Sequence, residues 1–323
     1  IVCKWPGAEE SRKVLLTFKK GVTQSWSLTK NKNIITGVIQ TNILPHAEVV
    51  EEAWRDIEQG RVVVKKLNTF DRIADVTDPG AFDGTNIETM SFVAYRDIAQ
   101  TYWAYCELRT QQGKSEEGAR TLVELHSVAR KALPEMVTPI SKLIWVALAN
   151  ADIRQAHVMA SDPRCSHEAL QVLRDGFPAF SKEATSFRKP AIALYINGRW
   201  SSRALKEGAY RVEDIPGSPT NSVVLNLLLK SILKTVLPNA TDRLGRGYLD
   251  ALLKNPPDVV DASEYRKKTP MNLCIRNIGG WLVISGLLLP SFDFGKAINT
   301  AFECGVRSEL LAVYLAERLG ETL

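Results

Sequence analysis

Three consecutive residues, Gly113-Lys114-Ser115, match the end of a phosphate-binding loop. In such a loop the backbone amides and the lysine bind phosphate oxygens, and another glycine stands five residues before the triplet. Leu108 occupies that position here. A buried strand must also lead into the loop, whereas the preceding residues carry apolar side chains at helical spacing. The triplet therefore predicts an exposed turn between two helices and not a nucleotide site.

Basic and aromatic residues concentrate between Lys182 and Arg211. Arg199 and Arg203 are four residues apart, which places both guanidinium groups on one face of a helix, and Trp200 lies beside Arg199. Arginine and tryptophan are enriched at the energetic centres of protein interfaces. The alternative is that the tryptophan is a core residue and that the arginines serve only solubility. We predict a partner-binding surface of four residues: Arg188, Arg199, Trp200 and Arg203.

The four histidines could bind a metal only if folding brought them together. His157 and His167 lie ten residues apart, near two aspartates and Cys165. This spacing matches neither the i, i+4 pair of a helical zinc site nor a closed tetrahedral set. His46 and His126 are farther away in the sequence. We expect His157 and His167 to be ordinary, partly exposed histidines, with no bound metal and no cofactor.

Hydrolytic chemistry needs a nucleophile with a base, or two converging carboxylates. The chain has no G-x-S-x-G motif, and we expect no strand that could position one. The acidic pairs Glu51-Glu52 and Glu116-Glu117 are adjacent in sequence, so their carboxylates point in different directions on a helix. No catalytic residue is therefore predicted. A hydrolase whose two carboxylates come from distant helices stays open as the alternative.

The composition predicts a globular protein. Of 323 residues, 45% are hydrophobic and 24% are charged, which argues against a disordered chain and against a coiled coil. The net charge of +5 is small for this length and gives no reason to expect nucleic acid as a partner. The five cysteines are scattered without a CxxC pair, so roles as small core residues are favoured over zinc binding. Whether any of them form disulfides stays open.

Apolar side chains recur at helical spacing in most segments after Pro45, and an all-α fold follows. We expect an irregular stack of helical hairpins, with a solenoid as one option. Ser115 is expected to cap the helix after Gly113, and Thr138 to cap a helix whose first residue is Pro139. The predicted helices cover 45–76 with a disturbance at Gly60, 91–112, 117–133, 138–161, 168–173, and about 308–319.

The chain divides into three regions. Residues 1–44 are predicted to form an irregular N-terminal arm, residues 45–211 a first helical region, and residues 212–323 a second helical region packed with the first as one unit. The segment RVEDIPGSPTNS, residues 211–222, is the best linker candidate because it combines prolines, a glycine and polar residues. The most apolar run, Ile278–Pro290, is shorter than the roughly 20 residues of a membrane-spanning helix and is expected to be a buried helix.

Two segments resemble a group of uncharacterised bacterial envelope proteins: GKSEEGARTLVELHSVARKALPEMVTPISKLIWVALANADIRQAHVMA and TPMNLCIRNIGGWLVISGLLLPSFDFGKAINTAFECGVRSELLAVYLAERL. The shared pattern is a Gly-led turn, two successive helices, and an Asn-led segment before the C-terminal helices. The usual NPxG form of that segment is replaced by MNLCIRNIGG, which begins at Met271. Those proteins have an N-terminal membrane segment and a helical region outside the cytoplasm. The resemblance extends over about half of the chain and implies an exported location and a helical fold, but no activity.

These features predict a non-enzymatic, exported helical protein that binds a macromolecular partner. One concrete form is a periplasmic inhibitor or immunity protein that neutralises a delivered toxin. The chain begins at Ile1, which suits a removed upstream signal or inner-membrane anchor and equally an ordinary boundary. The alternative is a cell-envelope hydrolase that acts on glycan or lipid, with its site between helices. Converging carboxylates in a polar cleft would favour the hydrolase, and a dry core with polar groups outside would favour the binding protein.

Overall fold

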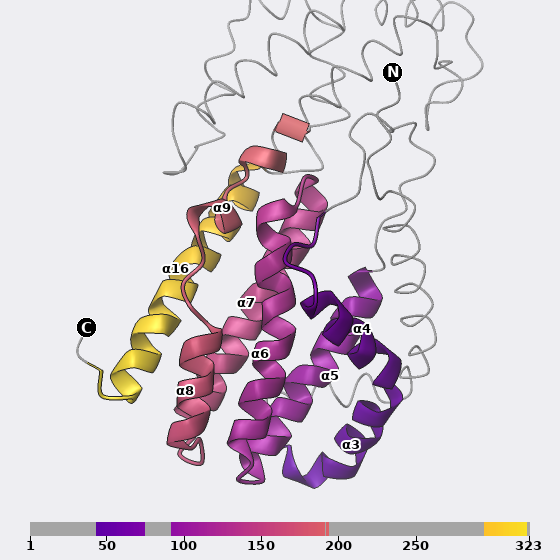
Figure 1. Ribbon diagram of the computed structural model, residues 1–323, viewed down its shortest axis with the longest axis vertical. Coiled ribbons are helices and arrows are strands. Elements are labelled where there is room, and N and C mark those ends of the chain that lie inside the picture. The colour runs from indigo at the N-terminus through magenta and orange to yellow at the C-terminus, as the bar shows by residue number, and fades with distance from the viewer. Residues whose placement is uncertain (1–42, 75–91, 191, 194–293, 322–323) are drawn as a thin grey trace, which may run out of the picture.

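The computed structural model describes residues 43–74, 92–190, 192–193 and 294–321, and the regular elements among them are all helices. The predicted all-α fold is confirmed. In Figure 1 the long helices lie side by side, with α16 along one edge and the α3–α4 pair along the other. No helix in these ranges is both long enough and apolar enough to cross a membrane. The elements are η2 (Leu44–His46), α3 (Ala47–Asp56), α4 (Glu58–Asn68), α5 (Phe92–Gln111), α6 (Ser115–Ala132), η3 (Leu133–Glu135), α7 (Pro139–Ser161), α8 (His167–Gly176), α9 (Lys182–Thr185) and α16 (Phe294–Arg318).

The Gly113-Lys114-Ser115 triplet forms the turn between α5 and α6, as predicted. Gly113 is exposed and has a φ of 76°, a backbone conformation that glycine adopts without strain. The predicted cap was wrong, because α6 begins at Ser115 and Lys114 precedes it without a side-chain cap. The Ser115 hydroxyl is buried and accepts a hydrogen bond of 3.0 Å from the backbone N–H of Ser166. This bond joins the N-terminus of α6 to that of α8.

The single long helix predicted after Pro45 is two helices, and the break lies at Ile57 rather than at Gly60. Gly60 lies inside α4 and is buried. A Cβ added to Gly60 would lie 2.7 Å from Cδ1 of Ile98, so the absence of a side chain lets α4 approach α5 closely. The glycine is therefore a packing residue and not a helix breaker.

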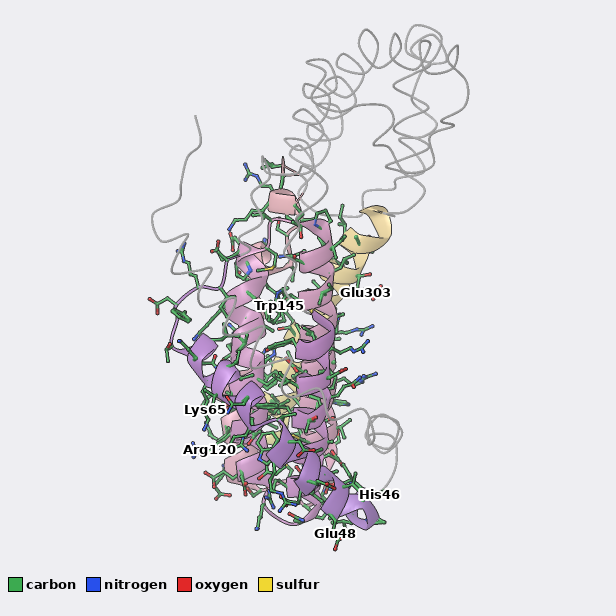
Figure 2. All side chains as sticks on the ribbon, turned by 90° about the vertical axis from the view of Figure 1, so that its right-hand side faces the viewer. His46, Glu48, Lys65, Arg120, Trp145 and Glu303 are labelled. Carbon is green, nitrogen blue, oxygen red and sulfur yellow. The ribbon has the colours of Figure 1, made fainter. Side chains whose placement is uncertain are left out.

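Helix α7 is the central helix of the bundle and is buried on almost all sides. It contacts α5, α6, α8 and α16, and Trp145 lies inside the bundle (Figure 2). The Thr138 hydroxyl accepts from the backbone N–H of Ser141 at 3.1 Å, and Pro139 is the first helical residue, as predicted. Pro139 fits there because the first helical N–H needs no intrahelical acceptor.

Helix α16 is much longer than predicted, since it begins at Phe294 and not near Ser308. Its first half packs on α7 through small residues such as Ala301 and Cys304. Gly305 permits close contact with Thr185, the last residue of α9. Glycine lowers helix propensity, and tertiary packing outweighs that effect here.

Three predictions lie outside the described residues. They concern the N-terminal arm up to residue 42, the linker at 211–222 and the apolar run at 278–290.

Candidate functional site

The predicted basic surface lies largely outside the described residues. Arg199, Trp200 and Arg203 belong to the range that the structure does not describe. Arg188 is exposed, and its backbone N–H donates to the Ser186 hydroxyl at 3.1 Å. The structure neither brings these four side chains together nor separates them, so the basic surface stays a prediction.

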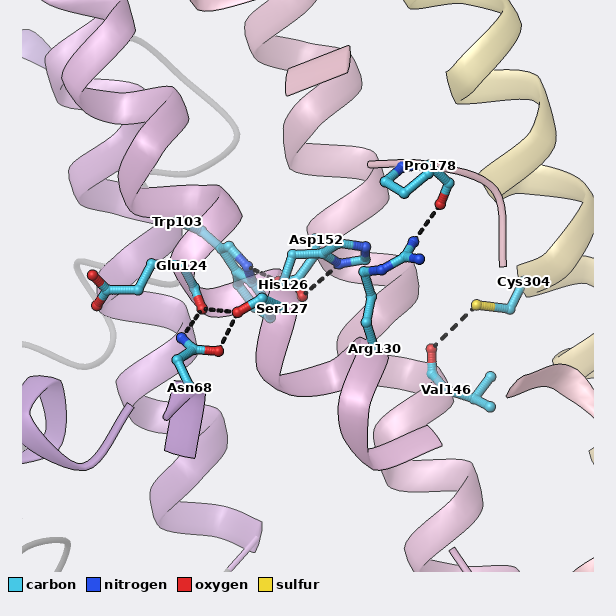
Figure 3. A network of polar contacts seen from close by, with 10 residues as sticks. All are labelled: Asn68, Trp103, Glu124, His126, Ser127, Arg130, Val146, Asp152, Pro178 and Cys304. Carbon is cyan, nitrogen blue, oxygen red and sulfur yellow. Dashed lines mark hydrogen bonds and ion pairs between the residues drawn. The ribbon is translucent and has the colours of Figure 1, made fainter. Parts of the chain in front are cut away.

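A buried polar cluster lies inside the bundle, centred on Asp152 of α7 (Figure 3). The indole N–H of Trp103 on α5 donates to Oδ1 of Asp152 at 2.7 Å, and Nδ1 of His126 on α6 lies 3.3 Å from Oδ2. The His126 ring stacks on Phe177, with ring centroids 4.0 Å apart. His126 and Asp152 are at most 2% exposed. One carboxyl group thus links three helices at the centre of the core.

The buried surroundings of this cluster disfavour the charged forms of Asp152 and His126. Burial raises the pKa of Asp152 and lowers the pKa of His126, because both charged forms lose their water. The hydrogen bond between the two groups opposes both shifts, because it lowers the pKa of Asp152 and raises the pKa of His126. Both oxygens of Asp152 are occupied by partners within the bundle. The arrangement suits a structural link between helices and presents no acid or base to a substrate.

Lys142 is a second buried polar residue of α7, and it holds two other segments. Its Nζ donates to the carbonyl oxygens of Leu133 and Ala184, both at 2.6 Å. Burial, followed by repulsion from Lys189, lowers the pKa of Lys142 to about 7. A neutral amine has two N–H groups, and both find an acceptor here. Lys142 therefore ties η3 and the last turn of α9 to α7.

Glu107 is the other buried carboxylate among the described residues. Its Oε1 accepts from Gln111 at 2.8 Å and its Oε2 accepts from Gln155 at 3.1 Å. In the described ranges no three His, Cys, Asp or Glu side chains are grouped so as to hold a metal. His157 and His167 are both exposed, and the His157 ring packs against Tyr314.

The buried cluster was not predicted, although the sequence contains a signal for it. His126 falls on the apolar face of its helix, beside Leu122 and Ala129, where a polar residue needs a buried partner. Lys142 lies among apolar residues in the first half of its helix, and Asp152 stands beside Ala151 and Ile153. A single sequence cannot show which of these groups meet, because Asp152 is 26 residues from His126 and 49 residues from Trp103 along the chain.

The outer face of α16 exposes a row of large apolar side chains. The exposed fractions are 46% for Phe302, 37% for Val306, 62% for Leu310 and 43% for Val313. Spacings of four, four and three residues place them on one face of the helix. We call these four residues the outer stripe. The five other large hydrophobic side chains exposed in the described ranges are spread over η2, α4, α7 and the turn after α4.

Charged residues lie on both sides of the outer stripe. The exposed Glu309, three residues after Val306, borders it on one side. Arg307 and Glu303 form an i, i+4 ion pair at 3.6 Å, and Figure 2 shows Glu303 on the outside of α16. The opposite face of α16 is buried against its neighbours through Ala301, Cys304 and Leu311. Helix α16 is therefore apolar on two opposite faces, of which only the inner one is covered within the described part of the chain.

No family model, no curated protein and no solved structure matches this chain. The resemblance to envelope proteins stays a prediction.

Proposed function

We propose that this chain is a helical binding protein that contacts a protein partner through the outer stripe of α16. The observation that carries the proposal is the continuous row formed by Phe302, Val306, Leu310 and Val313. Single exposed apolar residues are normal on protein surfaces, whereas contiguous apolar patches mark interaction sites. A straight row on one helix suits a second helix or an apolar groove as its counterpart.

The energetics favour an apolar counterpart. Complete burial of one Val, Leu or Phe side chain contributes about 1.5–3 kcal/mol. The four side chains are roughly half exposed, so covering the whole outer stripe contributes about 4 kcal/mol from this side. Association itself costs about 4–15 kcal/mol in lost freedom of motion. A stable contact therefore requires an equally apolar surface on the partner, which a nucleic acid backbone does not offer.

The buried polar groups support binding over hydrolysis. Both oxygens of Glu107 and both oxygens of Asp152 accept from, or lie against, side chains of the same bundle. These carboxylates hold helices together and do not converge on a cleft. An inhibitor or immunity protein is one kind of protein that needs only such a rigid scaffold and a specific surface. An exported location belongs to that version of the proposal.

The test introduces glutamate at two positions of the outer stripe and at one exposed control position elsewhere. Val306→Glu and Leu310→Glu place a charge on the outer stripe, while Val62→Glu places one on α4, where Val62 is 55% exposed. Immobilised parent and Val62→Glu should retain a protein that both stripe variants lose. Titration of that purified protein should show at least ~10-fold weaker binding to the stripe variants, or about 1.4 kcal/mol. Equal retention by all four proteins would contradict the proposal.

A further inference from the structure

We infer that the partner of the outer stripe is a second copy of this chain, with the two α16 helices packed antiparallel. The inference rests on the proposed function of the outer stripe. It follows from the spacing of the exposed residues and from the polar groups at the two ends of the row.

The outer stripe is nearly symmetric about its own middle. Phe302 and Val313 lie equally far from the point midway between Arg307 and Ser308, and Val306 and Leu310 lie equally far from Ser308, about 0.8 Å farther along the helix. A two-fold axis between these two points would place Phe302 approximately opposite Val313 of the second copy. It would place Val306 opposite Leu310. A two-fold interface has this property, since a residue i that contacts j requires j to contact i.

The polar ends of the row obey the same symmetry. Asn299 lies three residues before Phe302, Glu317 lies four residues after Val313, and both are exposed. In the antiparallel pair Asn299 would face Glu317 of the second copy, so an amide donor would meet a carboxylate acceptor. Arg307 lies near the axis, where two like charges would approach, but each is balanced by Glu303 in its own chain. The exposed Glu309 lies equally near the axis, and repulsion between its two copies would weaken the dimer.

The size of the row sets the expected strength. From Phe302 to Val313 the outer stripe extends over about 16 Å of helix. A contact along this length is smaller than the ~800 Å² per partner of a typical stable interface. Two copies of the outer stripe contribute about 8 kcal/mol together, against an association cost of at least about 4 kcal/mol. We therefore expect a weak, reversible dimer with a dissociation constant of about 1 mM.

The first experiment measures the mass of the full chain by sedimentation equilibrium between about 0.05 and 2 mM, a range chosen to bracket a dissociation constant of about 1 mM. The mass of the parent and of Val62→Glu should rise from that of a monomer toward that of a dimer across this range. Val306→Glu and Leu310→Glu should raise the dissociation constant at least ~10-fold, with unchanged far-ultraviolet circular dichroism. A parent chain that stays monomeric at every concentration would overturn the inference.

The second experiment tests the antiparallel arrangement with opposite charges. Leu310→Glu and Val306→Lys should each be monomeric alone. A mixture of the two should form heterodimers, because the antiparallel pair places position 310 opposite position 306. In a parallel pair position 310 of one copy would face position 310 of the other, so mixing the two variants would not restore dimer formation. Lack of recovery in the mixture would therefore reject the antiparallel pair.

The two proposals fail differently. If all chains are monomeric but the stripe variants still lose a different retained protein, the second copy is excluded and the proposed binding function stands. If stripe variants behave like the parent both in sedimentation and in retention, both proposals fail.

Discussion

The inside of α7 and the outside of α16 reverse the usual distribution of side chains. Helix α7 buries Asp152 and Lys142 in the core, while α16 turns Phe302 and Leu310 toward solvent. The buried polar groups have their donors and acceptors paired within the bundle, as burial requires. The exposed apolar groups have no such counterpart in the described part of the chain. The polar set holds the helices together, and the apolar set is the surface through which we propose that recognition occurs.

The largest effect is expected from Asp152→Ala. The substitution leaves the Trp103 indole N–H and the His126 ring nitrogen without a partner in the core. Removing one member of a buried pair costs about 3–5 kcal/mol of stability. Urea unfolding monitored by circular dichroism measures it. Asp175→Ala on the exposed end of α8 is the control and should change stability by less than ~0.5 kcal/mol. Similar midpoints for the two variants would remove the structural role assigned to the cluster.

The next effect concerns the inner face of α16. Leu311 is 4% exposed and packs into the core, so Leu311→Ala should destabilise the fold by about 3 kcal/mol through lost burial and a residual cavity. Thermal or urea unfolding at low protein concentration measures this. A loss below ~1 kcal/mol would mean that α16 is only loosely held against α7.

The pH dependence of Lys142→Met comes third. An unfolded chain keeps Lys142 protonated up to its ordinary pKa of 10.5, whereas the folded protein releases the proton near its lowered pKa of about 7. Above pH 7 the unfolded state therefore binds more protons, and this group makes stability rise with pH by up to about 1.4 kcal/mol per unit. Below pH 7 both states are charged and the slope disappears.

The measurement for Lys142 is a difference between two proteins. Urea unfolding of the parent and of Lys142→Met is compared at several pH values from about 7 to 8.5, and the titration of thiols cancels because both proteins contain the same cysteines. The parent should gain stability relative to the variant as pH rises. Parallel curves would show that Lys142 keeps its proton in the folded protein.

The fold followed from the sequence where local rules decide. Helical spacing identified α5, α6 and α7 within a few residues, and Thr138 with Pro139 marked the start of α7. Local rules failed at Gly60 and Ser115, because packing against distant residues determines both. The candidate site was not predictable for the same reason. The exposure of Leu310 and the burial of Leu311 depend on which face of α16 meets α7, which one sequence does not state.

The smallest expected effect belongs to Leu310→Ala, the neighbour and match of Leu311→Ala. Both replace leucine with alanine in the same helix, but Leu310 is 62% exposed. Little burial is lost on folding, and alanine is the better helix former, so stability should change by less than ~0.5 kcal/mol. The variant should nevertheless weaken whatever binds the outer stripe, since its side chain contributes to that contact alone. Unfolding at low protein concentration measures the effect on stability, and sedimentation at high protein concentration measures the effect on association. A loss of stability as large as that of Leu311→Ala would mean that Leu310 already serves the fold, and the outer stripe would no longer qualify as a binding surface.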